Sequence, residues 1–202
     1  EKSNKDNTCI LLASINGHVE MVDWLFKHGG SLNDRNSDGD SCILVASANG
    51  HLELVKWLLQ NGASIDDTEK IGNTCILLGA FYGHIELVGW LLENNCSLNE
   101  RNNNGDTCIL SAALSGKLEM VQYLYEHGAF LTDKNNFYES CLINASRSGS
   151  LELVKWLVEK GASLDETSRA GTCIMHAASN SHMECVIWML ANGSSINEAV
   201  EV

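Results

Sequence analysis

The sequence predicts an all-α protein built from six stacked helix–turn–helix repeats. A seven-residue segment that begins Thr-Cys or Ser-Cys recurs along the chain, with its six copies starting at Thr8, Ser41, Thr74, Thr107, Ser140 and Thr172. Subtracting successive start positions gives a period of 33 residues, and of 32 residues for the last step. Each copy is followed by a turn and by a second apolar stretch with helical spacing. A fixed period of about this length indicates stacked structural repeats rather than a closed globule.

The second repeat shows why each unit is expected to form two helices. Residues 36–40 are Asn-Ser-Asp-Gly-Asp, and these residue types favour turns. Ser41 stands at an N-cap position, where its hydroxyl would accept a bond from the first turn's amides. Residues 42–48 then predict a short first helix, and residues 52–59 predict a second one with apolar residues at helical spacing. Gly62 follows, and glycine is the usual helix-ending residue.

The remaining units keep the same order of loop, first helix, turn and second helix. One slot of the second helix is aromatic in every repeat, as Trp24, Trp57, Trp90, Tyr123, Trp156 and Trp188. In the loops, Tyr138 replaces a glycine of other repeats, so the fifth loop is expected to differ in shape. The predicted organisation is a single repeat domain over residues 1–202, with units at about residues 3–35, 36–68, 69–101, 102–134, 135–167 and 168–200.

The order loop, Thr-x-x-x-x-Ala, Gly-His, apolar helix, Gly-Ala and Asn resembles the ankyrin repeat. The family's usual Thr-Pro-Leu-His is here Thr/Ser-Cys-Ile/Leu, and the chain has no proline. The resemblance implies an α-solenoid of six stacked helix–turn–helix ankyrin-type repeats with projecting loops. It also implies a protein that binds other proteins through loop tips and the inner faces of the first helices, with no shared catalytic residues.

The contact positions that the resemblance implies are the loop residues before each seven-residue segment and the residues before each inter-helix glycine. Most of them are polar in this chain. The exceptions are Ile71, Phe81, Tyr82, Leu114 and Phe137, with Arg101 and Arg147 beside them. Because binding energy concentrates in aromatic residues and arginine, we expect these seven residues to bind a protein partner. An alternative is that Phe81 and Tyr82 only pack on a neighbouring loop.

Composition excludes several other classes of partner. Thirteen basic residues against 26 acidic ones give a net charge of −13, whereas binding a nucleic-acid backbone needs a basic face. No apolar run reaches about 18 residues, so no membrane span is expected. Six of the eight cysteines repeat with the period and are expected to be buried, reduced thiols, because neighbouring repeats lie too far apart for disulfides. Reduced cysteines favour the cytoplasm, or the nucleus.

Enzymatic, cofactor and metal-binding functions are not predicted. The cysteines and the histidines His18, His51 and His84 occupy periodic slots, which is typical of structural residues rather than of one active site. These histidines are interpreted as turn-capping residues. The sixth repeat contains Cys173-x-x-His176 and His182-x-x-Cys185, whose spacing resembles zinc-ligand pairs. A coincidence is the favoured interpretation, because two of the four residues recur in repeats that lack the others.

Two alternatives concern the ends and the loops. The first helix is as apolar as internal copies, and Ile187 stands where other repeats are polar, so the chain is either a segment of a longer array or a self-assembling element whose open ends stack head-to-tail. Asn33, Asn99 and Asn197 stand where family members often carry an asparagine that a hydroxylase modifies. The favoured interpretation for these three is a loop-stabilising side chain that bonds local backbone.

Overall fold

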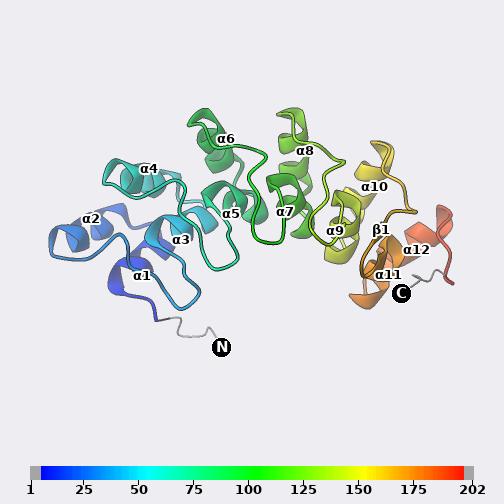
Figure 1. Cartoon of the computed structure of the whole chain (residues 1–202), viewed down its shortest axis with the longest axis horizontal. Coiled ribbons are helices and arrows are strands. Elements are labelled where there is room, and N and C mark those ends of the chain that lie inside the picture. Colours follow the sequence, from blue (N-terminus) through cyan, green and yellow to red (C-terminus); the bar gives the residue numbers. More distant parts are fainter. Residues whose placement is uncertain (1–5, 198–202) are drawn as a thin grey trace. The chain divides into compact units, whose positions relative to one another are not determined.

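The structure, a computed structural model, describes residues 6–197 and contains twelve helices and one short two-stranded sheet in that range (Figure 1). The first helices of the six repeats are α1 (Cys9–Ile15), α3 (Cys42–Ala48), α5 (Cys75–Tyr82), α7 (Cys108–Leu114), α9 (Cys141–Ser148) and α11 (Cys173–Ser179). The second helices are α2 (Val19–Lys27), α4 (Leu52–Gln60), α6 (Ile85–Glu93), α8 (Leu118–Glu126), α10 (Leu151–Glu159) and α12 (Met183–Ala191). Six paired helix–turn–helix units confirm the predicted all-α repeat fold.

The chain divides into two compact units between Asn103 and Asn104. In the first unit, α1 packs on α3 and α3 on α5, while each first helix also packs on the second helix of its own repeat. In the second unit, α7 packs on α9 and α9 on α11 in the same way. Apolar residues of both helices fill the space between them, so each unit has a continuous core. The extent of a single domain over residues 1–202 stays a prediction.

Left-handed backbone conformations end the second helices, as the sequence predicts. Gly29, for example, has φ 99°, and Asn95 takes the same place in the third repeat with φ 69°. The loop glycines Gly39 and Gly72 also have positive φ, of 89° and 82°. Tyr138 adopts φ 62° at the corresponding place, so the expectation of a different fifth loop was wrong: the tyrosine accepts the glycine conformation.

The hydroxyl groups of Ser41 and Thr74 have a different role from the predicted one, whereas Ser140 does accept from the N–H of Ile143 at 3.3 Å. Ser41 makes no side-chain cap bond and instead donates to the carboxylate of Asp67, 26 residues further on. Thr74 donates to Glu100 at 2.5 Å in the same way. The N-cap prediction for Ser41 was wrong because an ionised carboxylate is a stronger acceptor for its hydroxyl and lies within reach in the folded array. These bonds tie the beginning of one repeat to the loop at its end.

The inter-helix histidines connect neighbouring repeats rather than cap their own turn. His51 donates from Nε2 to the carbonyl oxygen of Ile15 at 2.9 Å, and His84 donates to that of Ala48 at 3.0 Å. The backbone oxygen can only accept, so these rings carry their proton on Nε2. The turn-capping interpretation is therefore wrong for His51 and His84, each of which bonds back to the preceding repeat, and His18 makes no side-chain cap bond either.

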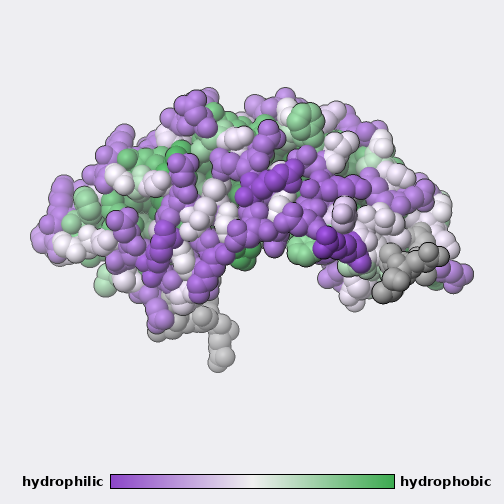
Figure 2. All heavy atoms as spheres, viewed as in Figure 1, coloured by the Kyte–Doolittle hydropathy of each residue, from purple (hydrophilic) through white to green (hydrophobic). Residues whose placement is uncertain are grey.

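The small sheet is the single departure from helices and loops among the described residues. β1 (Thr167–Ser168) pairs antiparallel with β2 (Gly171–Thr172) just before α11. In Figure 2, hydrophilic residues cover most of the viewed face and hydrophobic ones form small separate groups. None of the helices between residues 6 and 197 has the length and apolarity that crossing a membrane requires.

Candidate functional site

A groove of about 1010 Å³ lies within the first unit. It is formed by the exposed sides of α1, α3 and α5 and by the loops that precede α3 and α5. Its lining residues are Asn7, Leu12, Ile15, Asn16, Asn36, Asp38, Asp40, Val45, Ala48, Asn49, Glu69, Lys70, Ile71, Asn73, Leu78 and Tyr82.

The floor of this groove is apolar because one slot of the first helix is apolar in three consecutive repeats. Leu12, Val45 and Leu78 occupy that slot, at intervals of the repeat period. Leu12 is 48% exposed, whereas Val45 is nearly buried between its neighbours. A strip of aliphatic side chains in a concave surface provides the apolar contact area that binding sites need.

Tyr82 stands at one end of the groove, in a slot that holds asparagine in the two preceding repeats. The corresponding residues Asn16 and Asn49 donate from their side chains to carbonyl oxygens of their own helices, at 2.7 Å each. Tyr82 cannot make that short bond and is 49% exposed. Its ring lies edge-on to Phe81, with centroids 5.1 Å apart, and stacks on His84 at 6.3 Å. These contacts hold the aromatic ring in place without burying it.

Ile71 lies on the loop before α5 and is half exposed. The loop is fixed by Glu69, whose carboxylate accepts from the backbone N–H of Ile71 at 2.7 Å and from that of Asn73 at 3.0 Å. The N–H of Lys70 donates to the carbonyl of Asp38 in the previous loop at 3.3 Å. Ile71 is therefore an exposed aliphatic side chain on a loop whose backbone is held by hydrogen bonds.

The charged groups of the groove are mainly acidic. Asp38 and Asp40 lie on the loop before α3, and Asp40 accepts from the Nδ2 of Asn36 at 3.0 Å. Lys70 contributes a cation, but its ammonium donates to the carbonyl of Ser37. The groove thus combines an apolar floor with a carboxylate-bearing wall, which favours a partner with apolar and basic groups.

The seven residues predicted to bind a partner are distributed over both units. Ile71 and Tyr82 lie together in the groove, and Phe81 packs against Tyr82 while half-buried. Arg101 is exposed on the last loop of the first unit. The other three belong to the second unit: Leu114 is half-buried, Phe137 is 43% exposed and Arg147 is partly buried.

Arg147 belongs to a polar network that sequence reasoning missed. Its guanidinium binds the buried carboxylate of Glu139 through both terminal nitrogens, with Nη1 to Oε2 at 3.2 Å. Its Nη2 also lies 3.5 Å from Nδ1 of the buried His176, whose Nε2 lies 2.8 Å from the hydroxyl of Ser168. Asn135 adds a bond from Nδ2 to Glu139 at 2.9 Å.

The direction of the bonds in this network fixes the tautomer of His176. A guanidinium can only donate, so Nδ1 of His176 accepts and Nε2 carries the proton toward Ser168. The Ser168 hydroxyl then donates to the carbonyl of Gly171 at 3.1 Å. Burial lowers the pKa of His176 below its ordinary value, and the charge of Arg147 lowers this pKa further, while Glu139 acts in the opposite sense. A neutral, fully bonded His176 is thus a structural residue of the fifth and sixth repeats.

The cysteines have the environment of inert core thiols. All eight are free. The expected burial of the periodic cysteines is confirmed for five of them, Cys42, Cys75, Cys108, Cys141 and Cys173, and was wrong for Cys9, which is exposed. Burial raises the pKa of Cys75 to about 12 and also raises that of Cys141. Because the thiolate is the nucleophile and the metal ligand, these residues are poorly suited to either role.

The zinc-like spacing in the sixth repeat does not assemble a site. His182 donates to the carbonyl of Arg147 at 2.8 Å, and His176 is held by Ser168. Cys173 and Cys185 are buried. Among residues 6–197 no group of three or more histidine, cysteine or acidic side chains could hold a metal ion.

The asparagines of the loop ends have backbone bonds rather than side-chain ones. The N–H groups of Asn33, Asn99 and Asn197 each donate to a serine hydroxyl two residues earlier, at 3.2 Å. The serines, and not the asparagine side chains, therefore make the local loop bonds that were predicted at these places.

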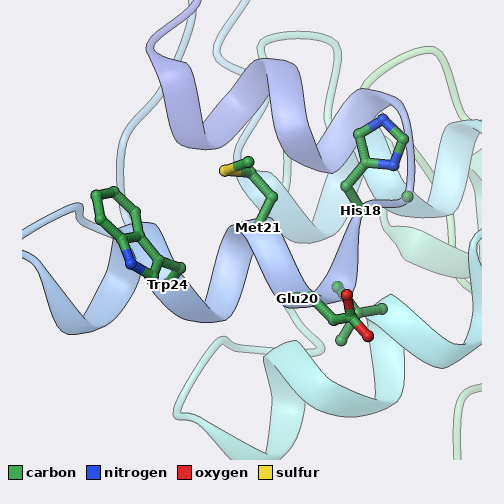
Figure 3. Close-up of a pocket in the computed structure, with 6 residues that line it drawn as sticks. His18, Glu20, Met21 and Trp24 are labelled. Atoms are coloured by element: carbon green, nitrogen blue, oxygen red, sulfur yellow. The ribbon is translucent and has the colours of Figure 1, made fainter.

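A second concave region lies at the N-terminal end of α2 and has a volume of about 790 Å³ (Figure 3). Gly17, His18, Val19, Glu20, Met21 and Trp24 line it. The indole of Trp24 stacks on His28, with ring centroids 4.0 Å apart. None of these six residues lines the groove of the first unit, although Gly17 directly follows Asn16, which does.

A family model described as ankyrin repeats (3 copies) matches residues 1–69, 43–135 and 130–199. A comparison with curated proteins gave no match. The family match covers nearly the whole chain and agrees with the six observed helix pairs. The chain therefore belongs to the ankyrin repeat family.

Proposed function

We propose that this chain is a non-enzymatic protein-interaction scaffold that binds its partner through the groove of the first unit. Ankyrin repeats imply protein binding in general. The observation that supports this particular surface is the placement of Ile71 and Tyr82, two exposed apolar side chains that the repeat scaffold does not require. Aromatic and aliphatic anchors of this kind, set over an apolar floor, are typical of binding hot spots.

The chemistry of the groove favours a protein segment that presents apolar and basic side chains. Asp38 and Asp40 would attract lysine or arginine at the wall, while Leu12, Val45 and Leu78 would contact apolar groups at the floor. A phosphate backbone is disfavoured, because carboxylates at the rim repel it. Arg101, which lies outside the groove lining, and Leu114, Phe137 and Arg147 of the second unit stay a separate prediction of partner contact, with a smaller share for Arg147, which already binds Glu139.

The experiment uses substitutions that the scaffold itself offers. Tyr82→Asn installs the residue found in the same slot of the two preceding repeats, so the fold is retained while the aromatic anchor is lost. Ile71→Ala removes the second anchor. A partner is captured on the native chain, identified by mass spectrometry and then measured by calorimetry as a purified protein.

We expect each substitution to weaken the partner's affinity about tenfold or more, the usual effect of removing a hot-spot side chain. Phe130→Ala is the matched control, because Phe130 is a similarly exposed aromatic residue of the second unit. Equal affinity of the native chain and of the double variant Ile71→Ala/Tyr82→Asn would remove the groove from consideration.

We also infer that the protein works in a reducing compartment, the cytoplasm or the nucleus. The support is the set of eight free cysteines, of which Cys42, Cys75, Cys108, Cys141, Cys173 and Cys185 are buried. Imaging of the tagged protein in cells tests this inference, and a signal confined to the secretory pathway would contradict it.

A further inference from the structure

The outer face of α1 and α2 exposes residues whose counterparts in the next repeats are buried. Met21 is 52% exposed, whereas the corresponding Leu54 and Leu87 are each 1% exposed. Cys9 is exposed, whereas Cys42 is fully buried. In the inner repeats these positions are covered by the preceding repeat. The outer face of α1 and α2 therefore has the composition of an inter-repeat contact surface, continuous with the contacts that hold the first unit together.

His18 adds a directional polar group to this face. Its counterparts His51, His84 and His182 each donate to a carbonyl oxygen of the preceding repeat, at 2.8–3.0 Å. His18 is exposed, and its imidazole has no hydrogen-bond partner among residues 6–197. Figure 3 shows Met21 between His18 and Trp24, and all three line the concave region at the N-terminal end of α2. The face thus presents one donor at the place where a preceding helix would offer its carbonyl.

The inner repeats also show which residue the imidazole of an inter-helix histidine requires at the inter-helix turn of the preceding repeat. A Cβ atom added at Gly17 would lie 2.5 Å from Nδ1 of His51, and one added at Gly50 would lie 2.5 Å from Nδ1 of His84. At Gly149 the distance to His182 would be 2.2 Å. These separations are far below van der Waals contact, so a repeat that precedes an inter-helix histidine needs glycine at its own inter-helix turn.

The last repeat fails this requirement. Ser181 occupies its inter-helix turn, in the same left-handed conformation as the glycines, with φ 63° against 75° for Gly149. The Cβ atom of Ser181 therefore stands where a following histidine ring would pack. A second copy of this chain cannot place its His18 against Ser181 in the way that His182 packs against Gly149.

We propose that the outer face of α1 and α2 binds a helix–turn–helix repeat that carries glycine at its inter-helix turn, and that Ser181 prevents the last repeat of a second copy from filling this place. The partner's first helix would offer a backbone carbonyl to His18, and its apolar side would cover Met21 and Trp24. His18, Met21 and Trp24 do not line the proposed groove, so the test does not depend on the groove's function.

The first experiment adds the proposed occupant to the full chain. A copy of residues 34–66 joined before Glu1 keeps the 33-residue period and places the copied Gly50 opposite His18. Four versions are compared by thermal unfolding, combining the copied glycine or Gly50→Ser in the copy with His18 or His18→Ala. The strain of serine in a left-handed conformation lowers the stability equally with His18 and with His18→Ala, so it cancels when the two losses of melting temperature are compared.

We expect Gly50→Ser in the copy to lower the melting temperature by about 2–4 °C more when His18 is present than when it is alanine, which corresponds to a coupling of about 1 kcal/mol in a domain of this length. Equal losses in the two backgrounds would overturn the proposed fit.

The second experiment measures self-association of the full chain by sedimentation velocity over a range of concentrations. The native chain is expected to keep one sedimentation coefficient, whereas that of Ser181→Gly rises with concentration, and adding His18→Ala to Ser181→Gly abolishes the rise. If Ser181→Gly behaves as the native chain does, the exclusion by Ser181 is wrong. If the native chain already associates and His18→Ala prevents it, the head-to-tail alternative is correct instead.

Discussion

The bidentate pair of Arg147 and Glu139 allows a sharp test of the network in the second unit. Arg147→Met keeps the length and much of the apolar stem of the side chain but leaves the Glu139 carboxylate with one donor fewer on each oxygen. Only 8% of the Glu139 side chain is exposed, so water cannot replace the lost donors. Asn135 continues to donate to Oε2 at 2.9 Å.

Removing one partner of a fully buried pair costs about 3–5 kcal/mol. Since 31% of the Arg147 side chain is exposed and Asn135 keeps its bond, we expect about 2 kcal/mol here. In a domain of this length that corresponds to a fall in melting temperature of about 4–8 °C, measured by circular dichroism. Lys155→Met is the matched control, because Lys155 pairs with the highly exposed Glu152 and such surface pairs contribute at most about 1 kcal/mol.

The double variant Arg147→Met/Glu139→Gln decides the cause of the loss. A neutral amide is easier to bury than a carboxylate, so the double variant is expected to recover more than half of the stability lost in Arg147→Met. If the double variant is no more stable than the single one, the loss does not come from an uncompensated charge and the reasoning is refuted.

Three further outcomes are expected. The pKa of His176 is lowered in the folded chain, so the stability that the neutral ring confers is complete above the ordinary value of 6.5 and falls as the pH drops below it. His176→Gln should therefore make the melting temperature less dependent on pH below 6.5, and an unchanged dependence would contradict the lowered pKa. His51→Ala should lower the unfolding free energy by about 1 kcal/mol through loss of the bond to Ile15, and His18→Ala by clearly less, so equal losses in chemical denaturation would count against the inter-repeat bond. A thiol reagent applied to the native protein should modify Cys9 well before Cys75, whose pKa is raised to about 12, and peptide mass spectrometry that finds equal modification would disprove the burial argument.

Much of the fold is predictable from the sequence because each repeat has the same order of loop, first helix, turn and second helix. The helices observed at Cys42–Ala48 and Leu52–Gln60 agree with the predicted ranges to within one residue. The replacement of Gly by Asn95 at a helix end is also confirmed by its positive φ. Six copies average out the ambiguity that a single short apolar run would leave.

Side-chain partners were harder to predict because they connect neighbouring repeats. Ser41 was interpreted within its own turn, but its partner Asp67 lies 26 residues away. The same separation joins Thr107 to Asp133 at 3.2 Å, so an acidic residue recurring at this distance was a usable signal. The spacing of 33 residues shows which residues share a slot, and it does not show which slots touch.

Comparison of equivalent slots between repeats predicts only part of the candidate site. Tyr82 is recognisable because it departs from Asn16 and Asn49 in one slot. The bond from Asn135 to Glu139 recurs as the bond from Asn36 to Asp40, but arginine and histidine stand at the places of Arg147 and His176 in no other repeat, so comparison between repeats could not reveal their contact. The contact requires two residues from consecutive repeats to meet in three dimensions, which depends on how the repeats pack and not on the repeated sequence pattern.

The bonds from inter-helix histidines to preceding carbonyls restrict how such a chain can change by duplication or exchange of its repeats. A repeat beginning its second helix after histidine accepts only a predecessor with glycine at the turn, as Gly17 precedes His51. The repeats with Lys117 and Ser150 in that slot have no imidazole to accommodate. A duplicated copy of the repeat that contains Ser181 is therefore expected to disrupt the junction when it precedes a histidine repeat. The order of repeats in this protein is thus restricted by two residues at each junction, the inter-helix turn residue of one repeat and the residue before the second helix of the next.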